Sequence, residues 1–243
     1  MPKLKFNIDG LILSLIGLMV LYLFWNDYLI FYIYPAYNGL VFVAAVLTLL
    51  FGLYNFVQTK QDDHCGCNDS SSNAAYSILK LLLFAPILIG LLLPPKPLSV
   101  ELALTRGVSF ELEANRQQSI FDTFTTNPEN RTLFDWIRVL TANPEPDTYL
   151  DQKVNLTGFL IYPKDYPDQV YISQFIISCC AADARPISLP VLNTELFQDY
   201  TEGDWISLLG SMQVYQSETE RKAIVKAEKI QAISPPKNPY VYQ

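Results

Sequence analysis

Hydrophobic residues are concentrated in the first part of the chain, in three long runs. The runs cover residues 8–25, 39–57 and 77–93 and contain few charged side chains. A helix needs about 20 apolar residues to cross a bilayer, so the pattern predicts three transmembrane helices. Lys3 and Lys5 precede the first run and no small-residue cleavage site follows it, which favours a retained helix over a signal peptide.

Basic residues near the ends of spans predict their orientation. Loop 26–38, on one side of the membrane, has no Lys or Arg. On the other side would lie four lysines: Lys3, Lys5, Lys60 and Lys80. The side reached after the third span has only two bases close to the membrane, Lys96 and Arg106. This favours a cytoplasmic N-terminus, a cytoplasmic loop 58–76 and an extracytoplasmic C-terminal domain. The predicted location is the plasma (inner) membrane, in contact with membrane lipid.

Beyond residue 93 the apolar spacing changes. Residues 94–150 are interpreted as a membrane-proximal linker with a helix near 132–141, because four apolar positions there share a helical face: Leu133, Trp136, Ile137 and Leu140. Residues 151–235 then alternate with the period of strands, and residues 236–243 are interpreted as a C-terminal tail. The predicted strands are 154–162, 170–180, 187–191, 204–215 and 222–233.

The order of these elements predicts the fold. A short helix at 194–200 separates the third and fourth strands, and Gly158 and Gly210 lie inside the first and fourth. Glycine within a strand permits the sharp bend that closes a small barrel. The pattern therefore predicts an OB-like five-stranded β-barrel, while an immunoglobulin-like sandwich would have about seven strands. The predicted fold class is a membrane-anchored α+β protein with three N-terminal transmembrane helices and this soluble barrel.

Charge argues against nucleic acid as a partner. Residues 94–243 carry 19 acidic and 13 basic side chains, a net charge of −6, and lack the cationic surface that phosphate backbones require. Barrel aromatics could in principle stack on bases, but packing in the core and rim is the better interpretation for all five: Phe159, Tyr162, Tyr171, Phe175 and Trp205.

Cys179 and Cys180 form the first candidate site, with Asp183 close by. On a strand the two thiols would point to opposite faces. A disulfide between them would be strained, since neighbouring Cα atoms are about 3.8 Å apart and disulfides prefer roughly 4.4–6.8 Å. Three hypotheses stay open: a soft metal site with Asp183 as third ligand, a redox switch, or a buried cysteine that packs as a small hydrophobe.

A second candidate site lies in loop 58–76. His64, Cys65 and Cys67 stand within a few residues of each other and are flanked by aspartates, a composition that chelates zinc or another soft transition metal. A structural zinc site needs four ligands, and the chain has no second C-x-C. Transient capture or a site shared with a partner is therefore favoured over a folded finger, and a polar loop with incidental thiols is the alternative.

The sequence does not favour an enzyme. His64 is the only histidine, and the predicted topology places it across the membrane from Cys179 and Cys180. A Cys–His or Ser–His pair therefore cannot form in the C-terminal domain. The chain also lacks a glycine-rich phosphate loop, G-x-S-x-G and H-E-x-x-H.

Several motifs together resemble the uncharacterised bacterial YcgQ-like membrane proteins. They are the three N-terminal spans, I-S-C-C-A-A-D-A-R-P from Ile177, the D-W-I-S-L-L-G stretch and the ending N-P-Y-V-Y. The resemblance implies a multi-span permease as partner and a transport-associated role, and it covers nearly the whole chain. Members often carry a His-rich stretch between spans two and three, from which this chain departs.

The first hypothesis is therefore a non-enzymatic accessory subunit of a permease complex, with a metal ion as the leading cargo. The second is an extracytoplasmic thiol-redox or metal-sensing membrane protein. Co-purification of a permease would favour the first, and reversible oxidation of Cys179 and Cys180 without a stable partner would favour the second.

Overall fold

A computed structural model of the chain describes residues 8–57, 82, 89–90, 93, 95–106, 127–217 and 221–242. The chain divides into two compact units, Met1–Lys96 and Pro97–Gln243, and each is described by itself.

The first unit contains the first two predicted spans. They are the helices α1 (Ile8–Trp25) and α2 (Asn38–Val57), joined through the short 3-10 helices η1 (Tyr28–Phe31) and η2 (Pro35–Tyr37). Both helical segments are long and apolar enough to cross a membrane. The third predicted span, 77–93, lies outside the described residues apart from four positions, and loop 58–76 lies outside them entirely.

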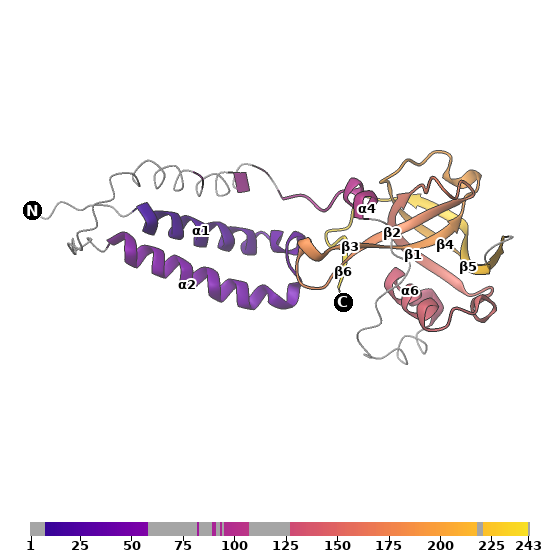
Figure 1. Ribbon diagram of the computed structural model, residues 1–243, viewed down its shortest axis with the longest axis horizontal. Coiled ribbons are helices and arrows are strands. Elements are labelled where there is room, and N and C mark those ends of the chain that lie inside the picture. The colour runs from indigo at the N-terminus through magenta and orange to yellow at the C-terminus, as the bar shows by residue number, and fades with distance from the viewer. Residues whose placement is uncertain are drawn as a thin grey trace, which may run out of the picture. The chain divides into compact units, whose positions relative to one another are not determined.

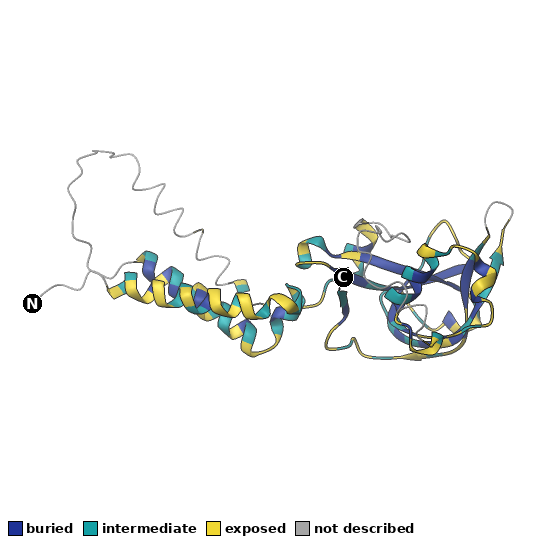
Figure 2. Ribbon diagram, turned by 90° about the horizontal axis from the view of Figure 1, so that it is seen from below, coloured by how far each residue is buried: buried dark blue, intermediate teal, exposed yellow. Residues whose placement is uncertain are grey.

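Small residues let α1 and α2 pack backbone against backbone in antiparallel directions (Figure 1). A Cβ added at Gly10 would lie 2.5 Å from the backbone nitrogen of Phe56, and one at Gly52 would lie 2.5 Å from that of Ser14. Such close approach is typical of membrane helices, where small residues admit the neighbouring backbone. Residues coloured as exposed run along both helices in Figure 2, and many of them are large and apolar. Among the described residues of this unit the two helices therefore leave apolar outer faces uncovered.

The second unit begins with short helices and continues as a sheet. In the described residues its α-helices are α4 (Val100–Arg106) and α6 (Leu133–Ala142), and its 3-10 helices include η3 (Pro128–Asn130) and η4 (Pro146–Tyr149). Its strands are β1 (Lys153–Ile161), β2 (Gln169–Ile177), β3 (Arg185–Leu192), β4 (Trp205–Gln216), β5 (Arg221–Ala232) and β6 (Tyr240–Tyr242).

The helix expected near 132–141 is α6. Thr132 caps it, because its hydroxyl accepts the N–H of Asp135 while the Asp135 carboxylate accepts the N–H of Thr132. Leu133 and Trp136 on its inner face are buried in the barrel core. The stretch interpreted as a linker therefore supplies part of the core.

Strands β1 to β5 close into a barrel, which confirms the predicted five-stranded architecture. Neighbours run β1–β4–β5–β3–β2, and β2 pairs again with β1. All pairings in this circuit are antiparallel except β3 with β5, which meet in parallel at Val191 and Val225. The helix expected at 194–200 is one 3-10 turn, η6 (Glu195–Phe197).

Glycines lie where the barrel bends, as predicted. The register of β4 against β5 shifts between Leu209 and Gly210, and a Cβ at Gly210 would collide with the backbone of Lys226. A Cβ at Gly158 would lie 2.6 Å from the carbonyl oxygen of Ser173 on β2. The barrel therefore closes by backbone contact at two points that admit no side chain.

The C-terminal tail expected at 236–243 contains a sixth strand. β6 pairs in parallel with β2, with Phe175 opposite Tyr240 and Ile177 opposite Tyr242. Three residues are too few to show a strand period, so the sequence pattern gives no sign of this pairing.

Candidate functional site

The turn between β2 and β3 carries Cys179, Cys180 and Asp183. β2 ends at Ile177, three residues before the predicted end of the strand, and the 3-10 turn η5 (Ala181–Asp183) follows. The carboxylate of Asp183 causes this early end, because it accepts the backbone N–H groups of Ser178, Cys179 and Cys180 at 3.1, 2.7 and 3.4 Å. These donors are thereby withdrawn from strand pairing.

Cys179 and Cys180 lie outside the strand, which changes the direction of their thiols. The expectation that Cys179 and Cys180 face opposite sides of a strand is wrong, because neither residue belongs to β2. Their sulfurs lie 3.6 Å apart as free thiols. Cys179 is exposed and Cys180 half-buried, so neither packs as a core hydrophobe.

A hydrogen bond to Asp183 keeps the Cys179 thiol protonated. The pKa of Cys179 is raised to about 12, first by its hydrogen bond to the Asp183 carboxylate and then by its hydrogen bond to Cys180. Burial raises the pKa of Asp183, but hydrogen bonds from the Cys179 side chain and from three backbone N–H groups outweigh it and lower the pKa. At neutral pH the turn therefore holds a carboxylate beside a protonated Cys179 thiol.

The structure brings together half of the predicted ligand set. One ligand atom from each of Cys179, Cys180 and Asp183 lies within 4.8 Å of the others. The other predicted ligands, His64, Cys65 and Cys67, lie outside the described residues, so metal binding there stays a prediction. The spacing in sequence indicated the first cluster, but it gave no sign that Asp183 organises the turn.

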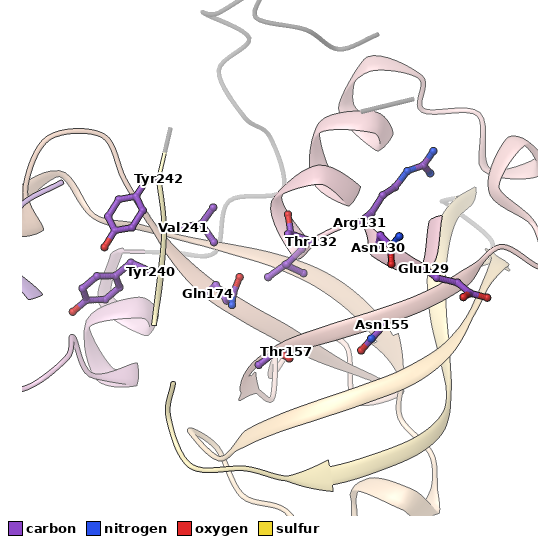
Figure 3. Close-up of a pocket in the computed structure, with 11 residues that line it drawn as sticks. Glu129, Asn130, Arg131, Thr132, Asn155, Thr157, Gln174, Tyr240, Val241 and Tyr242 are labelled. Carbon is purple, nitrogen blue, oxygen red and sulfur yellow. The ribbon is translucent and has the colours of Figure 1, made fainter. Parts of the chain in front are cut away.

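The second unit also has a polar pocket of about 600 Å³ that the sequence analysis missed. In the described residues β1 pairs with β2 only from Phe159 to Ile161, and the pocket opens where the strands separate (Figure 3). Its lining comes from η3, the start of α6, β1, β2 and β6: residues 129–133, Asn155, Thr157, Gln174 and residues 240–242. The pocket depends on β6, so no local sequence signal could have revealed it.

Three of the five aromatic side chains considered as a stacking platform contact one another. The Phe159 ring lies 5.5 Å from that of Phe175 and 5.7 Å from that of Trp205, measured between centroids. Phe159, Tyr171 and Phe175 are buried. The hydroxyl of Tyr162 is hydrogen-bonded to the carbonyls of Phe197 and Tyr200, so these contacts are in line with the packing interpretation.

The two units define a class of protein in which a closely packed apolar helical pair precedes a closed five-stranded β-barrel. The chain belongs to the DUF1980 family, whose C-terminal domain matches residues 114–243 and whose N-terminal domain matches residues 8–109.

The chain is also similar to a relative and to a solved structure. A protein of Streptococcus mutans serotype c (strain ATCC 700610 / UA159) is 23% identical over 252 residues, which cover 87% of this chain and 90% of the relative. It is named "Putative two-component membrane permease complex subunit". The solved structure "OBody NL8 bound to hen egg-white lysozyme" is 14% identical, with a TM-score of 0.24, and covers 35% of this chain and 98% of its own. The relative's name supports a permease-associated family, as the resemblance implied, while the YcgQ-like assignment stays a prediction.

Proposed function

We propose that the chain is a non-enzymatic accessory subunit of a membrane permease complex. The observation that carries this proposal is the relative named as a subunit of such a complex, because the likeness extends over 87% of this chain and so includes both units. In this proposal the helical pair docks on a multi-span permease, and the barrel lies at its extracytoplasmic mouth.

The chemistry of the helices favours docking over conduction. Polar atoms that face a bundle interior often mark conduction paths in membrane proteins. Here the hydroxyls of Ser14 and Thr48 each donate to a carbonyl four residues earlier in their own helix at 2.8 Å, and so does the side-chain amide of Asn55. Each of these groups is satisfied locally, so the described helices offer an apolar surface to a partner.

The chemistry of the barrel unit favours a non-catalytic role. A cysteine attacks as its thiolate, and the raised pKa keeps Cys179 protonated. His64 is the only histidine of the chain, which leaves the barrel without an imidazole base. Asp183 raises the pKa of the thiol beside it and does not activate it.

Co-purification tests the proposal. The chain would be expressed with a tagged multi-span permease of the kind that accompanies such subunits and solubilised in mild detergent. We expect a stoichiometric complex that survives size-exclusion chromatography. The variant Gly17→Leu should lose it, because a Cβ at Gly17 already lies 2.8 Å from the backbone nitrogen of Leu49. Gly39→Leu is the matched control, since a Cβ there has no atom within 4 Å.

A wild-type chain that elutes without the permease would contradict the proposal. If that chain also cycled reversibly between a dithiol and a disulfide at Cys179 and Cys180, the thiol-redox or metal-sensing alternative would take its place.

A further inference from the structure

The two sulfurs of the β2–β3 turn have the spacing of ligands on one tetrahedral ion. Zinc–sulfur bonds are about 2.3 Å long, so two thiolates at the tetrahedral angle lie about 3.8 Å apart, and two on a linear ion about 4.6 Å. The sulfurs of Cys179 and Cys180 lie 3.6 Å apart. The turn therefore already holds its thiols close to the tetrahedral separation.

The third ligand is fixed by the backbone. Both oxygens of Asp183 accept backbone N–H groups, three in all. A carboxylate has about four acceptor positions, and the thiol of Cys179 occupies the fourth. Loss of the thiol proton therefore frees that position for a bond to an ion. Because these hydrogen bonds form within the turn, the carboxylate is oriented beside the thiols before any ion binds.

Charge gives the site its preference for a cation. Three potentially anionic groups converge within 4.8 Å. While both thiols are protonated, the carboxylate of Asp183 is the one negative charge among the three. A divalent cation that displaces both thiol protons, with release of two H⁺, replaces their two positive charges and so balances the two thiolates. Thiolate ligands select soft or borderline ions such as zinc.

We propose that Cys179, Cys180 and Asp183 bind one zinc ion through three protein ligands and leave its fourth position open. Structural zinc sites are closed by four protein ligands, whereas this turn provides three and its Cys179 is exposed. The ion is therefore held in an exchangeable site. Transfer of zinc to or from a permease would use this exchange and rests on the proposed function. Zinc binding itself does not depend on that function.

Zinc titration of the full-length protein tests the site. The detergent-purified, reduced chain would carry Cys65→Ser and Cys67→Ser, so that Cys179 and Cys180 are the only thiols present. We expect one zinc per chain in competition with a chromophoric chelator. Cadmium should give the ultraviolet thiolate-to-metal band of two sulfurs, and either Cys179→Ser or Cys180→Ser should halve that band.

The third ligand needs its own variant. Asp183→Asn should weaken zinc binding at least tenfold, while Asp165→Asn, at an exposed carboxylate of the β1–β2 loop, should leave it unchanged. Circular dichroism would show whether Asp183→Asn remains folded. If it does not, the cadmium band in the single cysteine variants decides the ligand set.

Two results would overturn the proposal. One is a Cys65→Ser/Cys67→Ser chain whose two remaining thiols are titratable but which takes up no zinc at micromolar concentration, which would leave the pair as a dithiol only. The other is zinc binding that survives loss of both cysteines. If no permease co-purifies, the zinc result still stands, because zinc binding is measured on the chain alone. A Cys179→Ser/Cys180→Ser chain that binds the permease but no zinc would show that the two kinds of binding are independent.

Discussion

The hydroxyl of Tyr240 accepts a hydrogen bond from the backbone N–H of Leu98 at 2.8 Å, across 142 positions of sequence. Leu98 lies where the chain enters the second unit, and Tyr240 opens β6, the last strand. Tyr240 is also buried beside Phe175, its partner on β2. The two ends of the unit are therefore fastened to each other and to the barrel.

This contact predicts a stability difference between two tyrosines. Tyr240→Phe should lower the free energy of unfolding by about 1 kcal/mol, because the N–H of Leu98 loses its partner in a partly buried place. Tyr242→Phe is the control, since its hydroxyl donates to Asn238 at an exposed position, and it should change stability by less than about 0.5 kcal/mol. Urea unfolding followed by tryptophan fluorescence measures both. Equal losses would show that the Leu98 contact contributes nothing of its own.

Barrel closure predicts that one glycine cannot be replaced. Gly210→Ala should destabilise the second unit by about 1–3 kcal/mol, the usual cost of forcing atoms into a packed interior, because the new Cβ collides with the Lys226 backbone. Gly39→Ala in α2 meets no atom within 4 Å and should be neutral or slightly stabilising. Thermal unfolding by circular dichroism compares them. A neutral Gly210→Ala would mean that β5 can move away from this point.

Much of this fold could be predicted from residue patterns. Alternation located β1 and β4 within a residue of their observed bounds, because each strand has one face in the core. Gly158 and Gly210 marked the bends, since a glycine inside a strand often lies at a bulge, a tight bend or a close backbone approach. The first two helices followed from the length of their apolar runs.

The remaining features depend on contacts between distant segments. β6 has three residues and takes its place from β2, and the polar pocket needs both. The early end of β2 results from the Asp183 carboxylate, which competes with the sheet for N–H groups. Spacing identified Cys179, Cys180 and Asp183 as a cluster, but only the turn fixes their geometry.

The hydrogen bonds of Asp183 predict an acid-dependent loss of stability. Its folded pKa is lowered from 3.8: burial raises it, but hydrogen bonds from the Cys179 side chain and the backbone outweigh burial. Well above pH 3.8 the folded and unfolded carboxyls are both ionised, so the stabilisation is fully present. Below it the unfolded chain binds the proton first, and the stabilisation is lost as the pH falls through the folded pKa.

Measurement of this effect needs Asp183→Asn as the reference. The difference in free energy of unfolding between wild type and this variant should be constant above about pH 5 and shrink below about pH 4. Chemical unfolding at a series of pH values gives the difference. A gap that widened on acidification would show that the carboxyl is bound in its neutral form.

The same carboxylate predicts slow chemistry at Cys179. With its pKa raised from 9.0 to about 12, the thiolate fraction at pH 8 falls by about a thousandfold, and the greater intrinsic reactivity of a more basic thiolate recovers only part of this. A chain with Cys65→Ser, Cys67→Ser and Cys180→Ser loses the hydrogen bond to Cys180 but keeps the one to Asp183, the first cause of the raised pKa. In it iodoacetamide should modify Cys179 up to roughly 30-fold more slowly than an ordinary exposed thiol. Adding Asp183→Asn should restore most of the rate, because it removes the first cause of the raised pKa. Mass spectrometry with a chelator present gives both rates, and equal rates in the two chains would show that Asp183 does not govern the thiol.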